Sequence, residues 1–281
     1  MRTSLPILLL CPVLLLASAA SAQAPEPRTQ FRVCKDPNNM PFSNAKAEGY
    51  EDKIAQLFAK DLGLPVTYYT FPQRMGFIRN TLRYKLPGED YPCDIVMSVP
   101  KDYGQVLATK AYYRSTYALV IPRGKGMDNV KSQEDFLALA PERLHALRIG
   151  VYDRSPASAW LAHHQLVDQG VPYRILNADP DQYPGQIIED DLAHGKLDVA
   201  IVWGPIAGYF ARRVSTPALM VVPLKSEPDV QMDFEIAMGV RFGESDWKKQ
   251  IDGLIERDQT QIQAILAEYG VPLAQAGEAA H

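Results

Sequence analysis

The stretch that organises this chain runs from Phe31 to Asn44 and reads FRVCKDPNNMPFSN. Its first residues favour a β-strand that contains a cysteine, and the residues after them form a polar loop with two prolines and two adjacent asparagines. Apolar residues at helical spacing follow between Ile54 and Leu62. A strand that leads through a polar loop into an amphipathic helix is typical of a binding loop in an α/β protein.

The N-terminal residues predict export. Arg2 supplies a positive charge, Leu5 to Leu16 form an apolar run of about 12 residues, and Ala20-Ser21-Ala22 offers the small residues that a signal peptidase needs. The run is too short to cross a bilayer, which takes about 20 residues, and no later stretch is apolar for long enough. We therefore expect a signal peptide over residues 1–22, cleavage near Ala22 and no membrane span afterwards.

Charge and cysteine content narrow the class of protein further. The chain of 281 residues carries 29 Lys and Arg against 33 Asp and Glu, a formal net charge of −4, and it has no basic run. This balance argues against nucleic acid or an anionic membrane as the main partner. Cys34 and Cys93 remain after cleavage, and an even pair in an exported protein favours a disulfide over two free thiols.

The order of predicted elements indicates two lobes. Residues 31–99 follow a β-α-β-α-β pattern, and residues 147–203 repeat it without a repeat in sequence. A change of composition at Pro122-Arg123-Gly124 suggests a first crossing, and strands near 220–223 and 234–240 lead back before a long helix over 247–269. The predicted fold class is α/β and bilobal, with lobe I at 23–122 and 224–281, lobe II (123–223) inserted into it, and a cleft between them.

Loops at the carboxyl ends of the strands would face that cleft, because ligands bind there in open α/β sheets. Polar groups around a few aromatic rings suit a small polar ligand. Asp153-Arg154-Ser155 at a helix start is either an anion site or an ordinary cap, and Tyr117 either lines the cleft or packs between the lobes. The candidates are Asp36, Asn38, Asn39, Phe42, Gln73, Arg74, Ser98 and Lys101 in the first lobe, and Arg154, Ser155, Ser158 and Trp203 in the second.

Catalysis has weak support in the sequence. It holds no G-x-S-x-G elbow and no reactive-cysteine signature, and Asp36 is the one cleft-loop acid worth nominating. His163 and His164 point about 100° apart on a helix, so we expect a solvated pair and not a metal site. We also expect the acids Glu189-Asp190-Asp191 to be exposed to solvent. The prediction is a protein that is not an enzyme and has no metal and no cofactor.

Four strings support a more specific reading: RVCKDPNNMPFSN, FPQRMGFIRNTL, CDIVMSVPKDY and TKAYYRSTYALV. They resemble family 3 periplasmic solute-binding proteins, and more narrowly the MoxJ/XoxJ type of accessory protein encoded beside PQQ-dependent methanol and alcohol dehydrogenases. The resemblance implies a type II periplasmic-binding-protein fold and residence in the periplasm. It also implies a non-catalytic role in the maturation or activation of a quinoprotein dehydrogenase.

This chain departs from the amino-acid binders of that family. Those proteins carry an Arg after the third strand for the ligand carboxylate and an acid after the second lobe's last parallel strand for the ammonium, whereas this chain has Pro100-Lys101 and Trp203-Gly204-Pro205 there. Burying an amino acid's charges without partners costs several kcal/mol, so a standard amino acid is not expected as ligand. Two functions stay open: an accessory partner of a PQQ dehydrogenase, or the binding subunit of an ABC importer that delivers a small polar solute to its permease.

Overall fold

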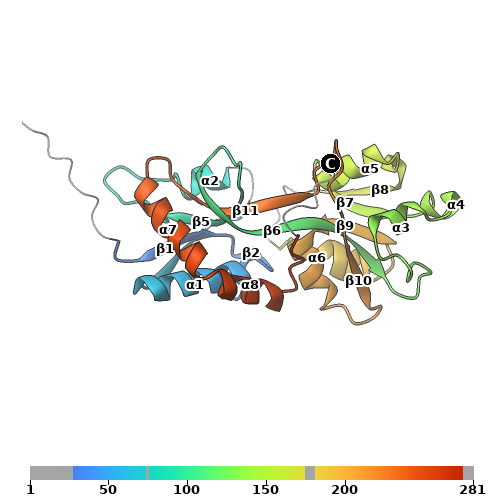
Figure 1. Ribbon diagram of the computed structural model, residues 1–281, viewed down its shortest axis with the longest axis horizontal. Helices are drawn as coiled ribbons and strands as arrows, with labels where there is room; N and C mark the ends of the chain where they lie inside the picture. Colours follow the sequence, from blue (N-terminus) through green and yellow to red (C-terminus); the bar gives the residue numbers. More distant parts are fainter. Residues whose placement is uncertain (1–27, 74–75, 175–180, 275–281) are drawn as a thin grey trace, which may run out of the picture.

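The computed structural model describes residues 28–73, 76–174 and 181–274, so the predicted signal peptide and Arg74 lie outside the described residues. Figure 1 shows two lobes side by side, one built around α1, α7 and α8 and the other around the elements from α3 to β10. No described helix is long and apolar enough to cross a membrane.

The first lobe is a mixed sheet in the order β4-β1-β5-β11-β6. β1 pairs in parallel with β4 and β5, whereas β11 runs antiparallel to β5 and β6. The strands are β1 (Phe31–Lys35), β4 (Val66–Thr70), β5 (Ile95–Pro100), β6 (Leu107–Pro122) and β11 (Asp233–Val240), and β2 (Asn38–Asn39) and β3 (Ser43–Asn44) form a small hairpin. The helices are α1 (Tyr50–Leu62), α2 (Phe77–Asn80), α7 (Ser245–Arg257) and α8 (Gln259–Glu268).

The second lobe places β9 between β6 and β7, with β8 at the edge and β10 paired to β6. Its strands are β7 (Ile149–Tyr152), β8 (Gly170–Tyr173), β9 (Val199–Trp203) and β10 (Leu219–Pro223). Its helices are α3 (Gln133–Leu137), α4 (Pro141–Leu144), α5 (Pro156–His163), the 3₁₀ turn η1 (Val167–Gln169), the short π-helix η2 (Ile187–Leu192) and α6 (Gly204–Ala211). The capping box predicted at Ser132 is confirmed, since its side chain accepts the N–H of Asp135.

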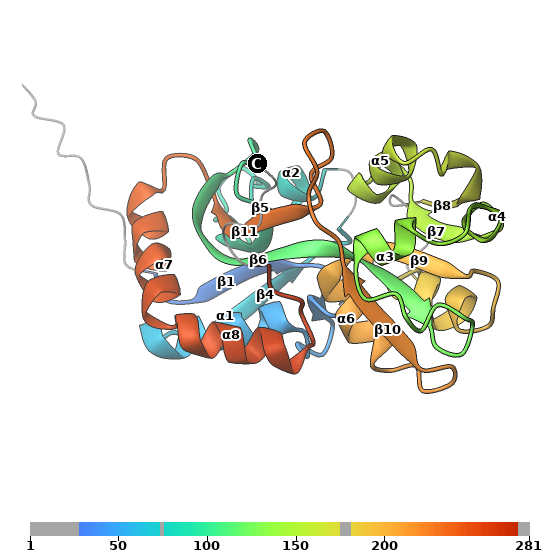
Figure 2. The same cartoon turned by 45° about the vertical axis from the view of Figure 1, so that its right-hand side comes forward.

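One long strand joins the lobes. The 16 residues of β6 pair with β11 as far as Thr116, and from Tyr117 onward they pair with β9 and β10 (Figure 2). After β10, the side chains of Leu224, Val230 and Met232 still pack in the core of the second lobe. The predicted lobe boundaries at residues 122/123 and 223/224 therefore stay a prediction. The strand pairing shows only that β6 changes its partner strands between Thr116 and Tyr117.

The first lobe buries apolar side chains on both faces of its sheet. On one face, Ile54 and Phe58 of α1 pack with Ile251 of α7, all of them fully buried. On the other face, Cys34 and Cys93 lie with Leu82 in a smaller cluster. The predicted disulfide between Cys34 and Cys93 is confirmed, with a Cα–Cα distance of 5.3 Å.

Two helix predictions were wrong in their extent, and one helix was missed. The helix expected over 247–269 is broken at Asp258 into α7 and α8, and apolar spacing continues across the break, so periodicity could not reveal it. The helix expected to reach Gly170 ends at His163. α6 was not predicted, because Gly204-Pro205 reads as a break, although proline fits the first turn of a helix.

Candidate binding cleft

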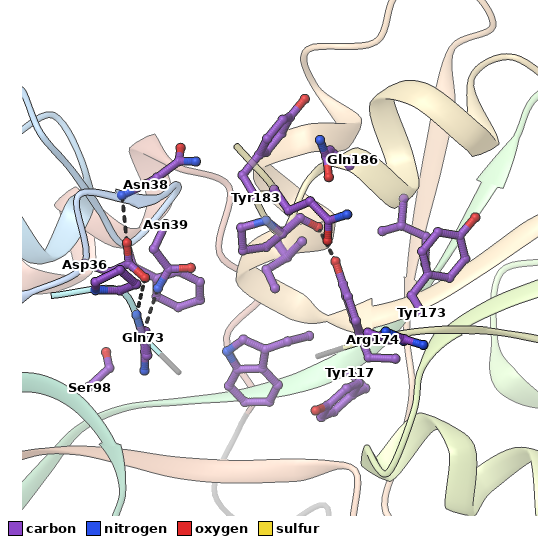
Figure 3. Close-up of a pocket in the computed structure, with 18 of the residues that line it drawn as sticks. Asp36, Asn38, Asn39, Gln73, Ser98, Tyr117, Tyr173, Arg174, Tyr183 and Gln186 are labelled. Carbon is purple, nitrogen blue, oxygen red and sulfur yellow. Dashed lines mark hydrogen bonds between the residues drawn. The ribbon is translucent and has the colours of Figure 1, made fainter. Parts of the chain in front are cut away.

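A cavity of about 1050 Å³ lies between the lobes and receives side chains from both of them (Figure 3). Its first-lobe lining comes from the loops after β1 and β4 and from the end of β5, where the carboxyl ends of parallel strands place a ligand site. The predicted residues that line it are Asp36, Asn38, Asn39, Phe42, Gln73, Ser98 and Trp203.

Asp36 organises the first-lobe rim. Its carboxylate accepts the backbone N–H of Asn38 at 2.8 Å and that of Gln73 at 2.5 Å. The side chain of Asn39 donates to the side-chain oxygen of Gln73 at 2.7 Å. These contacts, drawn as dashed lines in Figure 3, join the loop after β1 to the loop after β4. The carboxylate is thereby used as a structural acceptor.

A buried ion pair between Lys35 and Asp52 stabilises the loop after β1. Lys35 and Asp52 are 3% and 1% exposed, and the Lys35 ammonium contacts the Asp52 carboxylate at 2.9 Å and the carbonyl oxygen of Asn44 at 2.7 Å. Asp52 also accepts the N–H of Gly49 at 3.0 Å. At Gly49 a Cβ atom would lie 2.0 Å from the carbonyl oxygen of Phe42, so only glycine allows this close approach.

Glu51 is a cleft acid that the sequence did not single out. It lies in the first turn of α1, is 9% exposed and lines the cavity. Burial raises the pKa of this carboxyl to about 7, against a smaller opposing effect of a hydrogen bond with Ser98. In sequence it stands beside Asp52 as one of two acids in a first helical turn, a common pattern with no functional meaning of its own.

Aromatic rings from three strands line the cavity where the lobes meet. Tyr117 of β6 lies 5.4 Å from Trp203 of β9 between ring centroids, and Trp203 lies 5.9 Å from Phe234 of β11. Tyr117 therefore both lines the cavity and packs between the lobes, and burial raises the pKa of its hydroxyl to about 12. These rings contribute aromatic surface to the lining of the cavity.

The second lobe contributes tyrosines that the sequence analysis did not name, together with acids that it expected to be exposed. Tyr173 donates to Asp191 at 2.5 Å, and the same carboxylate contacts Lys196 at 2.7 Å. Tyr183 donates to Glu189 at 2.8 Å, and Arg213 contacts that glutamate at 2.9 Å. The prediction of an exposed cluster is confirmed for Asp190, whereas the side chains of Glu189 and Asp191 are each 21% exposed because tyrosine and basic partners cover them.

The remaining second-lobe lining shares this mixed polar and aromatic character. In Figure 3, labelled side chains of the second lobe face the rim formed by Asp36, Asn38 and Gln73. A run of polar and aromatic residues before η2 was the available signal, but no motif marks it. The lining residues of this lobe that sequence reasoning missed are Tyr152, Tyr173, Arg174, Tyr183, Gln186, Asp190, Asp191 and Lys196.

Four predicted site residues do not line the described cavity. Lys101 is exposed and contacts Glu235 at 2.8 Å. Ser155 is the N-cap of α5, and it and Ser158 both donate to the carbonyl oxygen of Tyr152, at 2.6 and 2.8 Å. Arg154 precedes this cap with φ of 55°. The interactions of this segment are those of an ordinary helix cap.

The prediction of a solvated histidine pair holds for His163 and was wrong for His164. The side chain of His163 is 37% exposed and that of His164 is 18% exposed, so the second ring is largely covered. Both rings contact the carboxylate of Glu227, His163 at 3.1 Å and His164 at 3.0 Å. The pair lies away from the residues that line the cavity.

Two α/β lobes, two chain crossings between them (β6 and the segment from β10 to β11) and a lined cavity at their junction define the class of bilobal periplasmic binding proteins. Within that class, the chain belongs to the MoxJ/XoxJ family, which is related to the family 3 solute-binding proteins. It is 36% identical to the crystal structure of periplasmic binding protein XoxJ from Methylobacterium extorquens AM1, covering 88% of this chain and all of that one, with a TM-score of 0.70.

Other comparisons agree with this membership. Protein MoxJ of Methylorubrum extorquens is 28% identical over 272 residues, 92% of this chain and 85% of that protein. An ancestral cationic amino acid solute-binding protein shares the fold, with a TM-score of 0.63 at 18% identity over 86% of this chain and 96% of that one. No protein-family model matches the chain. The resemblance, the fold class and the expectation of a binding protein that is not an enzyme are confirmed.

Proposed function

We propose that this protein is exported, is cleaved near Ala22, and assists the maturation or activation of a PQQ-dependent methanol or alcohol dehydrogenase in the periplasm. The similarity to XoxJ across the whole of that chain supports this role. A binding protein devoted to one partner enzyme needs a cleft that does not retain common nutrients, and the geometry of this cleft meets that requirement.

The observation that carries the proposal is the lack of amino-acid anchors in the described cleft. Lys101 stands where amino-acid binders have their arginine, but it is exposed and engaged with Glu235 outside the cavity. After β9 the chain enters α6 through Gly204 and Pro205, without an acid for an ammonium group. Neither position therefore offers an α-amino acid the charged group that amino-acid binders place there, and the guanidinium that lines the described cavity is that of Arg174 in the second lobe.

The lining favours a cationic group as occupant. The described lining residues include the acids Asp36, Glu51, Asp190 and Asp191, against the cations Arg174 and Lys196. Lys196 is paired with Asp191, and Glu51, with a pKa of about 7, is partly ionised at neutral pH. The rings of Tyr117 and Trp203 also line the cavity, and the face of an aromatic ring attracts a cation. We therefore infer that the cleft receives a Lys- or Arg-bearing peptide segment of the dehydrogenase or a small cationic co-ligand, held by Asp36, Asn38, Asn39, Phe42, Gln73, Ser98 and Trp203.

A pull-down tests the role. The protein, with a removable C-terminal tag, is captured from its own periplasm together with two variants, Glu51→Arg in the cleft and Glu142→Arg on α4. Glu142 is exposed and does not line the cavity, so it is a matched charge-reversal control. A quinoprotein dehydrogenase should co-purify with the wild type and the Glu142 variant and be lost with Glu51→Arg. Capture of no dehydrogenase would contradict the role, and equal capture by all three proteins would contradict use of the cleft.

Calorimetry with synthetic peptides tests the ligand class separately. Short peptides that differ only in a central Lys, Arg, Gln or Glu serve as probes. The Lys and Arg peptides should bind at least about tenfold more tightly than the Glu peptide, which corresponds to about 1.4 kcal/mol. Equal or reversed affinities would contradict a cationic occupant without bearing on the dehydrogenase partnership.

The second candidate function is that of a binding subunit for an ABC importer of a small polar solute. The observation in its favour is the cavity of about 1050 Å³ with lining from both lobes, a form suited to enclosing a whole ligand by hinge closure. Mass spectrometry of natively purified protein decides between the two. A metabolite bound at about one molecule per protein chain, with no dehydrogenase captured, would favour the import function over the accessory role.

A further inference from the structure

Two histidines and a glutamate converge at the end of α5, outside the cleft. The Nε2 atom of His163 lies 3.1 Å from one carboxylate oxygen of Glu227, and the Nε2 atom of His164 lies 3.0 Å from the other. One ligand atom from each of the three residues can be chosen so that all lie within 4.8 Å of one another. We propose that these three side chains form a binding site for a divalent transition-metal ion, with Zn²⁺ as the best-suited ion.

The end of the helix makes this convergence possible. α5 ends at His163, and His164 is the C-cap residue with φ of −93° and ψ of 12°. The two ring centroids are 5.0 Å apart with an angle of 84° between the ring planes. Adjacent histidines inside a regular helix diverge by about 100°, which is why spacing alone argued against a metal site. Here Glu227 approaches from a separate segment and faces both rings.

The distances suit a zinc ion. Zinc binds imidazole nitrogen at about 2.0–2.1 Å and carboxylate oxygen at about 2.0–2.2 Å, so neighbouring ligand atoms of a tetrahedral site lie about 3.3 Å apart. The nitrogen-to-oxygen distances of 3.1 and 3.0 Å run from the two imidazoles to different oxygens of Glu227, and each needs to open by only a few tenths of an ångström. Two imidazoles and a carboxylate bound through both oxygens supply four ligand atoms, and this ligand set suits zinc better than calcium or magnesium.

The ligands are held by a second layer of contacts. The side chain of Gln133, on α3, donates to Glu227, and its own oxygen accepts the N–H of Lys225 at 3.2 Å. The ring of His164 lies 4.5 Å from that of Trp160, which is fully buried. Side chains that orient metal ligands in this way contribute to affinity, because the ligands need not reorganise on binding.

Binding would link two separate parts of the second lobe. Glu227 lies between β10 and β11, in a turn closed by hydrogen bonds with Val230 of 2.9 and 3.1 Å. Both imidazoles must be neutral with Nε2 free of its proton, which then resides on Nδ1. The ion would join α5 to the segment that leads from the second lobe into β11 of the first lobe. A ligand that binds only the folded state also raises its stability.

The test uses the full mature chain, with any affinity tag removed, after treatment with a chelator and dialysis. Zn²⁺ is added at pH 7.5 in competition with a chromophoric chelator. We expect one ion per chain with a Kd below about 1 µM. Co²⁺ in place of Zn²⁺ should give the visible absorption of a four-coordinate site.

Variants separate this site from adventitious binding. His163→Ala and Glu227→Gln should each weaken Zn²⁺ binding at least about tenfold, and Gln133→Met about tenfold through loss of orientation. The control combines His145→Ala with His194→Ala, two exposed histidines elsewhere, and should bind like the wild type. Circular dichroism verifies that each variant is folded. A wild-type Kd weaker than about 1 µM, or tight binding that survives in both His163→Ala and Glu227→Gln, would overturn the proposal.

Discussion

The carboxylate of Asp36 accepts the backbone N–H of Gln73 at 2.5 Å, although 37 positions separate the two residues in the chain. This bond joins the loop after β1 to the loop after β4 and sets the rim of the cleft. Asp36, the one acid that the sequence analysis suggested for catalysis, thus has a structural role in joining two loops.

Replacing Asp36 should therefore affect stability. Asp36→Ala removes the acceptor of two backbone hydrogen bonds, and we expect a loss of about 1–2 kcal/mol in the free energy of unfolding, measured with urea. Asp102→Ala, at an exposed position, should change it by less than about 0.5 kcal/mol. Equal effects of the two substitutions would show that the loop contacts contribute nothing.

The disulfide between Cys34 and Cys93 should contribute more to the free energy of unfolding than the contacts of Asp36 do. Cys34 and Cys93 are 59 positions apart, so their bond restricts a large part of the unfolded first lobe. A Cys34→Ala, Cys93→Ala double variant should lose about 2–4 kcal/mol of unfolding free energy.

Reductant provides the control for that experiment. It should destabilise the wild type by a similar amount and leave the double variant unchanged. A reductant effect of the same size on both proteins would argue against the bond as its source.

Glu51 should make stability depend on pH. Its pKa is about 7 in the folded protein against an ordinary value of 4.5, so the folded state binds more protons than the unfolded state between these values. Stability should therefore fall as pH rises from about 4.5 to about 7 and then level off, by at most about 3 kcal/mol.

A conservative substitution isolates this effect. Glu51→Gln cannot ionise, so relative to the wild type it should be more stabilising at pH 8 than at pH 5, by thermal or urea unfolding. Glu142→Gln, on the exposed face of α4, should show no such difference. The account of Glu51 fails if the two variants give the same pH dependence.

Standard amino acids should not bind tightly. The described cleft lacks the arginine and the acid at the two positions where amino-acid binders carry them, and Lys101 is engaged with Glu235. Calorimetric titration with each amino acid should give no heat that fits a Kd below about 100 µM, which corresponds to about −5.5 kcal/mol. Micromolar binding of any one of them would refute this expectation.

Local sequence was sufficient for much of the fold. Alternating strands and amphipathic helices predicted two α/β lobes, and the even pair of cysteines in an exported chain predicted the disulfide that the structure contains. Errors arose where one pattern fits two structures. The apolar spacing from α7 continues into α8 across Asp258, and proline after glycine starts α6 although it commonly ends a helix.

The sequence predicted the cleft residues on loops after strands but missed those on helices, and the reason is physical. Asp36, Asn39 and Gln73 follow strands directly, so the rule that ligands bind at the carboxyl ends of strands brings them to one place. Glu51 and Asp191 lie on helices whose inward faces depend on how the lobes pack. No local pattern separates them from solvated acids on other helices.

The sequence by itself determined the class and family of the protein, because strand and helix periodicity and the stretch from Phe31 to Asn44 are local properties of the chain. Only the tertiary structure decided which charges meet. Burial raises the pKa of Glu51, and the meeting of α5 with the segment after β10 brings His163 and His164 to Glu227. Electrostatic environment and metal coordination depend on distances between residues far apart in the chain, and folding alone sets those distances.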